Sequence, residues 1–115
     1  MTEAELQIRI RRTESFLVAS DGQFLGQLSS NCYLSESVMN EYGTYGSKYS
    51  SFSIFNKYGT YGSQYNFLSP FSQYSLTPPK IFLRGLFAGY LTVNNSIQNR
   101  VDPHLLFDYI YSQGL

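Results

Sequence analysis

The chain has 115 residues, of which 11 are Tyr and 9 are Phe, whereas Lys and Arg together number 8 and Asp and Glu together number 8. A folded chain of this length has material for one hydrophobic core, so we expect a single domain, 1–115. Zero net charge argues against a nucleic-acid partner, because neutralising phosphates requires a cluster of Lys and Arg. No apolar run approaches the roughly 20 residues that cross a bilayer, which argues against a transmembrane segment.

The N-terminal segment begins with acidic residues and has no apolar h-region of a secretory signal. We therefore expect a cytoplasmic protein, with export of a longer precursor as the alternative. Residues 6–11 alternate apolar with polar side chains, which favours a half-buried strand, although Leu6 and Ile10 also have helical spacing. An apolar run at 16–19, an Asp-Gly turn signal and a second run at 24–29 predict a β-hairpin. The first predicted unit is a strand and hairpin over 5–31.

Three rows of sixteen residues follow at 35–50, 51–66 and 67–82, and they align without a gap. Ser37, Ser53 and Ser69 coincide, and the first two rows share the block Tyr-Gly-Thr-Tyr-Gly-Ser. The composition alone is typical of a prion-like low-complexity segment, polar with interleaved aromatic residues. A fixed register favours ordered repeats instead, and the divergent third row is typical of a capping copy.

A second hairpin is predicted at 80–94, and its residues 84–94 align with residues 21–31 of the first hairpin. The alignment pairs Gly26 with Gly89 inside the second strand of each hairpin. Glycine weakens a strand unless a bulge or a close neighbour requires it. We therefore expect a large aromatic ring from the repeats to lie against each of these two glycines.

The C-terminal segment predicts a helix over 102–113. Asp102 and Pro103 are typical of a helix start, and four apolar residues have the spacing of one helical face: Leu105, Leu106, Tyr109 and Ile110. The predicted fold is α+β and mainly β. A small sheet of two related hairpins is packed against irregular aromatic repeats and one C-terminal helix.

The repeat motif Asn-x-Tyr-Gly predicts an Asx-turn, in which the Asn side chain bonds the backbone two residues on and the Gly takes a positive φ. Two interpretations of the tyrosines stay open. In the first, tyrosine replaces aliphatic residues in a thin core. In the second, tyrosines form a recognition surface, because Tyr offers contact area at low entropic cost. Tyr45 and Tyr61, each between two small residues, are our candidates for that surface, together with Asn40 and Asn56.

Catalytic and metal-binding patterns are missing. His104 is the single histidine and no Gly-x-Ser-x-Gly elbow is present, so we expect an exposed first-turn residue rather than a catalytic base. Cys32 has no basic neighbour that would activate it, and we expect a small buried side chain. The repeats lack the carboxylates of a calcium site and the lysine of a phosphate loop, so we expect no metal and no cofactor. The basic cluster of Arg9, Arg11 and Arg12 is more typical of a solvated surface than of an anion site.

Residues 21–94 resemble a group of uncharacterised small bacterial proteins and domains. The resemblance rests on the hairpin sequence Asp-Gly-Gln-Phe-Leu-Gly-Gln-Leu and on tandem Asn-x-Tyr-Gly-x-Tyr-Gly-Ser-x-Tyr repeats. It implies a bacterial origin and this architecture, and it implies no activity.

The leading hypothesis is a non-enzymatic protein-interaction module whose partner is another protein or a second copy of the chain. The alternative is a small-ligand binding or sequestering protein, in which Tyr rings stack on a planar or sugar-like ligand and Asn and Arg side chains orient it. A small enzyme of unknown type is the third hypothesis.

Overall fold

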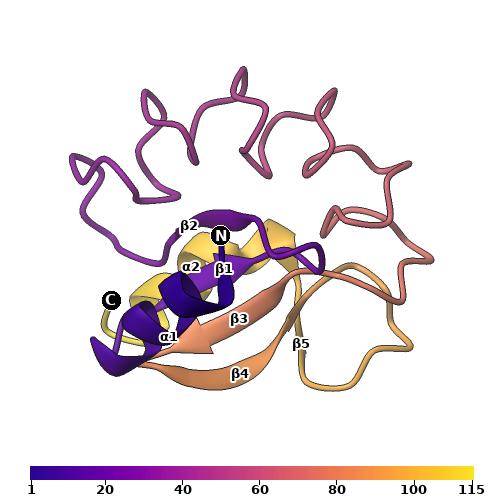
Figure 1. The fold of residues 1–115 in the computed structure, drawn as a ribbon. Helices are drawn as coiled ribbons and strands as arrows, with labels where there is room; N and C mark the ends of the chain where they lie inside the picture. The colour runs from indigo at the N-terminus through magenta and orange to yellow at the C-terminus, as the bar shows by residue number, and fades with distance from the viewer.

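The computed structural model describes residues 1–115 and has a five-stranded sheet with two α-helices and a short 3₁₀ helix (Figure 1). The elements are α1 (Glu3–Arg11), β1 (Phe16–Val18), β2 (Phe24–Gln27), β3 (Lys80–Leu83), β4 (Leu86–Leu91), β5 (Arg100–Val101), η1 (Pro103–Leu105) and α2 (Leu106–Ser112). The strand order is β2-β1-β3-β4-β5, antiparallel except for the parallel pair β4-β5. The predicted α+β class and C-terminal helix are confirmed.

The two predicted hairpins are β1-β2 and β3-β4, and they join through the antiparallel pair β1-β3. Both have a register shift next to the aligned glycine, where Gly26 has φ +120° and Gly89 has φ +149°. A Cβ on Gly26 would lie 2.8 Å from Cβ of Tyr45, whereas a Cβ on Gly89 would lie 2.1 Å from the backbone oxygen of Asn99. The nearest atom to that position at Gly26 is Cγ1 of Val38, at 2.6 Å. The prediction of an aromatic ring is therefore wrong at Gly89, where backbone is in contact, and at Gly26 a tyrosine makes contact through its Cβ, together with Val38.

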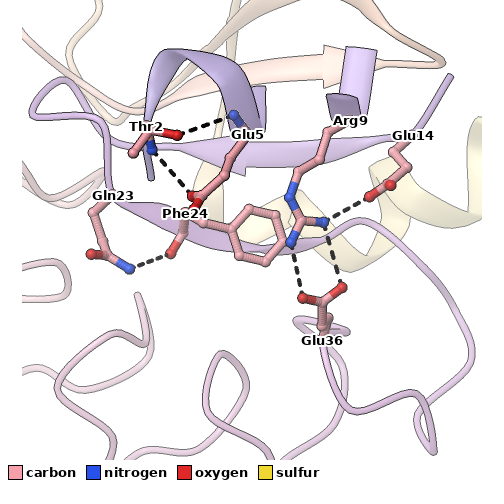
Figure 2. Close-up of polar contacts among 7 residues, drawn as sticks. All are labelled: Thr2, Glu5, Arg9, Glu14, Gln23, Phe24 and Glu36. Carbon is pink, nitrogen blue, oxygen red and sulfur yellow. Dashed lines mark hydrogen bonds and ion pairs between the residues drawn. The ribbon is translucent and has the colours of Figure 1, made fainter. Parts of the chain in front are cut away.

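The N-terminal strand prediction is wrong, because this segment is helix α1. Thr2 and Glu5 form a reciprocal capping box, in which the side chain of each accepts the backbone N–H of the other (Figure 2). Acidic residues occupy the first turn, and Arg9 and Arg11 occupy the last, which complements the helix dipole. These end effects outweigh an alternation that spans only six residues.

The sheet is covered on both faces, with α1 in front of it and α2 behind it in Figure 1. On the α1 face, Leu6 and Ile10 pack against a cluster of Phe16, Val18 and Phe24. The larger cluster on the other face combines the sheet, α2 and the repeats: Leu17, Ala19, Leu25, Leu28, Val38, Ile54, Tyr61, Ile81, Leu91, Leu106 and Ile110. The repeats thus complete the main core.

The repeats form a chain of consecutive β-turns over residues 31–75, which we call the turn ribbon and which is the arc of small loops in Figure 1. Each turn is closed by a backbone bond from an N–H to the carbonyl three residues earlier, and the next turn starts where the last one ends. Within each full repeat one step spans four residues, as in Ser47 N to Gly43 O at 3.1 Å and Ser63 N to Gly59 O at 3.0 Å. Four steps of three residues and one of four account for the period of sixteen.

The inner side of the turn ribbon takes small and aliphatic side chains. Ser37 and Ser53 are fully buried, and their hydroxyls donate to the backbone oxygens of Ser29 and Tyr45, eight residues earlier. These bonds satisfy carbonyl groups that have no ladder partner. The first repeat also attaches to the edge of β2, where the N–H of Gln27 donates to Glu36 O at 2.7 Å.

The repeat glycines do not have the positive φ that the sequence predicts. Positive values occur at Gly22, Gly26, Gly85, Gly89 and Gly114, all outside the turn ribbon. Space is the reason for glycine in the repeats, because a Cβ on Gly46 or Gly62 would lie 2.1 or 2.2 Å from the backbone oxygen of the repeat Asn. The glycine lets two turns of the ribbon come into contact.

The C-terminal helix starts as predicted, with the Asp102 side chain accepting the N–H of His104 at 2.9 Å. Its first turn is 3₁₀ and becomes α-helical at Leu106. Leu106 and Ile110 are buried in the main core, whereas Leu105 is 55% exposed, so the predicted apolar face is narrower than expected. No helix of the structure combines the length and the apolar character needed to cross a membrane.

Candidate functional site

Tyr45 and Tyr61 are not the exposed tyrosines that the sequence analysis predicted. Tyr61 is 9% exposed and belongs to the main core, and its hydroxyl donates to Oδ2 of Asp21 at 2.7 Å. Burial and this hydrogen bond to a carboxylate raise the pKa of Tyr61 to about 12. Tyr45 is half-buried, and its ring lies edge-on against Phe24 with centroids 4.9 Å apart. Burial, followed by the negative charge of Glu36, raises the pKa of Tyr45.

The amides of Asn40 and Asn56 are already used within the turn ribbon. The Oδ1 atoms accept the N–H groups of Tyr42 and Tyr58 at 3.1 Å, which confirms the predicted Asx-turns. The Nδ2 groups donate to backbone oxygens six residues earlier, at 3.2 Å and 3.1 Å. Both asparagines therefore stabilise the ribbon and position the tyrosine two residues later.

The six most exposed tyrosines of the chain all lie on the turn ribbon, on the side that we call its outer side. They are 77% to 90% exposed, and they alternate at intervals of nine and seven residues: Tyr33, Tyr42, Tyr49, Tyr58, Tyr65 and Tyr74. Each is the third residue of a turn whose first residue is Asn or Ser. The first residue's side chain caps the tyrosine N–H in five of these turns. The signal is in the sequence, as [Asn/Ser]-x-Tyr, and it also finds Tyr33, which lies outside the three aligned rows.

Three of these rings border two adjoining clefts along the ribbon. A cleft of about 660 Å³ lies between Tyr58 and Tyr65, and one of about 520 Å³ lies between Tyr65 and Tyr74. The two clefts share Gln64, Tyr65 and Phe71. We call the two clefts together the tyrosine groove, and its border includes Phe55, Tyr58, Gln64, Tyr65, Phe71 and Tyr74.

The C-terminal helices support the floor of the tyrosine groove. The ring of Phe55 packs edge-on against Phe107 of α2 with centroids 5.6 Å apart, and Phe71 packs against His104 of η1 at 5.3 Å. His104 is exposed, as predicted, and its Nδ1 lies 2.9 Å from Oδ1 of Asp102. Hydrogen bonds from the backbone N–H and the side chain of His104 to the Asp102 carboxylate lower the pKa of Asp102. The groove is therefore built by the ribbon and by the last elements of the chain together.

A smaller cleft of about 340 Å³ repeats this arrangement 32 residues earlier in the chain. Tyr33, Met39 and Tyr42 take the places that Tyr65, Phe71 and Tyr74 have in the tyrosine groove. Cys32 also borders this smaller cleft and is exposed, so the prediction that it is buried is wrong. The recurrence shows that the repeat supplies this part of the cleft lining, whereas Val93 and His104 line the larger cleft alone.

Charge in the tyrosine groove is sparse. Lys57 lies at one end with Nζ 5.3 Å from the centroid of the Tyr58 ring, and it forms no ion pair. The polar groups along the groove are otherwise neutral amides and hydroxyls, together with the imidazole of His104. No three His, Cys, Asp or Glu side chains gather closely enough to hold a metal ion.

The predicted basic cluster contains a structural ion pair rather than an open anion site. The guanidinium of Arg9 bonds Glu14 at 2.7 Å and Glu36 at 3.0 Å, and its Cζ lies 3.7 Å from the centroid of Phe24 (Figure 2). Burial would lower the pKa of Arg9, but the hydrogen bonds and charges of Glu36 and Glu14 raise it overall. Arg9 thereby connects α1 to the first repeat.

No family model, curated protein or solved structure matches this chain. The resemblance to bacterial proteins with tandem tyrosine repeats therefore stays a prediction.

Proposed function

We propose that the protein is a non-enzymatic protein-interaction module that binds its partner at the tyrosine groove. The observation that carries this proposal is the row of tyrosines, 77% to 90% exposed, at equivalent turn corners. Soluble proteins seldom leave large contiguous aromatic surfaces uncovered without an interaction that uses them. Tyrosine also supplies contact area at a low cost in side-chain entropy, and it dominates many recognition surfaces.

The backbone beneath these rings is held in place before any partner binds. The N–H groups of Tyr58 and Tyr65 are capped at 3.1 Å by Asn56 and Ser63, and each turn is closed by its own backbone bond. A binding surface that is already ordered loses less conformational entropy on association. The groove therefore supports binding without a folding step.

Site-specific photo-crosslinking in cells tests this proposal. A benzophenone amino acid replaces Tyr65 in the groove or, as the matched control, Tyr49, which has the same turn position and borders neither cleft. We expect a discrete protein adduct from position 65 and none from position 49. The adduct should also disappear when Tyr58→Ala and Tyr74→Ala are added. Equal adducts from both positions, or no adduct at 65, would overturn the proposal.

The small-ligand hypothesis is the second candidate, because a cleft of about 660 Å³ is within the size range of small-molecule sites. Native mass spectrometry of protein purified from cells separates the two, since a copurifying small mass favours this hypothesis. The enzyme hypothesis gains no support from the geometry. The His104 ring contacts Asp102 and Phe71, and no hydroxyl or thiol forms a hydrogen bond to it.

A further inference from the structure

We propose that the partner presents an extended, proline-rich segment to the tyrosine groove, with an acidic residue beside its prolines at the Lys57 end. This inference rests on the proposed function and names the chemistry of the partner. The recurring modes of peptide recognition are strand addition, a helix in a groove, binding of acidic or phosphorylated motifs, and binding of polyproline II segments.

Strand addition does not fit the turn ribbon. A new strand needs a row of free backbone N–H and C=O groups along an extended edge. In the ribbon, the N–H of Tyr58 is bonded to the side chain of Asn56, and the N–H of Gly59 is bonded to its backbone oxygen at 3.0 Å. The same pairing recurs along the ribbon, so it presents no free ladder.

A helical partner does not fit either, because a helix about 10 Å wide needs an uninterrupted apolar trough. Here Tyr58, Tyr65 and Tyr74, 77% to 86% exposed, divide the groove into successive slots. Binding of phosphorylated or strongly acidic motifs needs a cluster of arginines. The groove contains one lysine and no arginine.

Of the four modes of peptide recognition, binding of a polyproline II segment is the one that fits the groove. It is extended with three residues per turn, and its backbone carbonyls have no internal partner. Its compact pyrrolidine rings suit slots between aromatic side chains, as in other aromatic-lined grooves that bind such segments. The hydroxyls of Tyr58, Tyr65 and Tyr74 form no hydrogen bond within the chain, since Tyr61 alone uses its hydroxyl in this way. These hydroxyls and the amide of Gln64 are donors for the carbonyls of the segment.

Charge complementarity sets the direction of the segment. Lys57 is unpaired at one end of the groove, and its counterparts in the other repeats are Glu41 and Gln73. An acidic residue at the matching end of the segment would pair with Lys57. A segment with a basic residue at that place would be repelled.

The test begins with a random dodecapeptide library displayed on phage and selected on the full-length wild-type chain. We expect enrichment of peptides with closely spaced prolines and an acidic residue to one side of them. The affinity of a fluorescein-labelled enriched peptide is then measured by fluorescence anisotropy. Tyr65→Ala should weaken binding by about tenfold or more, as for a central aromatic contact, and Tyr49→Ala should change it by less than about twofold. Thermal melts establish that both variants are folded.

A charge exchange makes the test specific to the groove. Lys57→Glu should weaken binding of the acidic peptide. It should strengthen binding of the same peptide with Lys in place of its acidic residue. Enrichment of peptides without proline, equal binding to Tyr65→Ala and Tyr49→Ala, or no enrichment at all would overturn this inference. If this inference fails and crosslinking from position 65 still yields a groove-dependent protein adduct, the proposed function stands without a proline-rich partner. Binding of a neutral linear glycan in place of any peptide or protein would overturn both.

Discussion

Tyr61 and Tyr65 lie four residues apart in the same repeat and have opposite environments. Tyr61 is 9% exposed with its hydroxyl bonded to Asp21, whereas Tyr65 is 86% exposed and borders the groove. The difference comes from the turn position, because Tyr65 is the third residue of a turn capped by Ser63, and Tyr61 precedes the close contact at Gly62. The residue type alone therefore does not distinguish a core tyrosine from an exposed tyrosine in this fold.

The same contrast extends to the two sides of the turn ribbon. The inner side must approach its neighbouring turns and the sheet, and it is restricted to residues such as Ser53, Ile54 and Gly62. The outer side has no packing partner, so packing does not explain why aromatic residues recur there. The requirements of folding explain the residue types on the inner side, whereas they do not explain the exposed aromatic residues on the outer side.

The largest expected effect is the difference between alanine substitutions at the two tyrosines. Tyr61→Ala removes a buried ring and leaves Oδ2 of Asp21 without its donor, so we expect a loss of about 3–5 kcal/mol in the free energy of unfolding. Tyr65→Ala should change that free energy by less than about 0.5 kcal/mol, as for an exposed residue. Urea titrations measure both values. Similar losses in the two variants would contradict the inner and outer assignment.

Gly62→Ala should have the next largest effect. The added Cβ would lie 2.2 Å from the backbone oxygen of Asn56, so the ribbon must shift, at a cost of about 1–3 kcal/mol. The midpoint of thermal unfolding should fall by about 4 °C per kcal/mol. Gly59→Ala is the matched control, since its Cβ would meet a side-chain atom, Nδ2 of Asn56, at the longer distance of 3.1 Å. A control as unstable as Gly62→Ala would show that close packing is not the cause.

The pH dependence of stability should distinguish the buried hydroxyl from the exposed ones. The pKa of Tyr61 is about 12 in the folded protein, against about 10 for an unfolded tyrosine, so the folded state holds the proton more tightly. Its contribution is complete below about pH 10 and is lost as the pH rises through about 12. Tyr61→Phe should therefore lose less stability than the wild type across this window in urea titrations.

Tyr49→Phe is the control for that measurement, because Tyr49 is exposed and its hydroxyl forms no hydrogen bond within the chain. The free energy of unfolding of Tyr49→Phe should fall with rising pH as steeply as that of the wild type. Burial also raises the pKa of Tyr45 and of Tyr109, and both should maintain part of the slope in Tyr61→Phe. An unchanged slope in Tyr61→Phe would show that burial and Asp21 do not raise the pKa of Tyr61 in the folded protein.

The smallest expected effect is at the ion pair that connects α1 to the first repeat. Glu36→Gln removes the charge that lies 3.0 Å from Arg9, at a partly exposed position, so we expect a loss of about 0.5–1 kcal/mol. This loss should shrink in about 1 M NaCl because exposed charges are screened. Glu41→Gln removes a carboxylate that forms no ion pair, and it should have no comparable effect.

Local signals in the sequence predicted a large part of the fold. The two hairpins, the irregularity beside Gly26 and Gly89, the Asx-turns of Asn40 and Asn56 and the cap at Asp102 depend on residues close together in the chain. The helix at the N-terminus differs from the predicted strand because the capping box of Thr2 and Glu5 outweighs a short alternation. That signal was present and is also local.

The site was harder to predict, because exposure depends on where each turn lies in the ribbon. Tyr45 and Tyr61 have the same small neighbours that suggested exposure, yet the close contacts at Gly46 and Gly62 turn them inward. Cys32, expected inside, lies at an exposed turn beside Tyr33. The groove also requires Phe107 and His104 beside the ribbon, which no pattern within the repeats indicates.

The sequence by itself determined the period of sixteen, the duplicated hairpins and the side chains that cap each turn, since these follow from backbone hydrogen bonding over a few residues. Only the tertiary structure decided which tyrosines are buried and where the groove lies. The physical reason is that an exposed fraction depends on contacts with the sheet and with α2, which are distant in the chain.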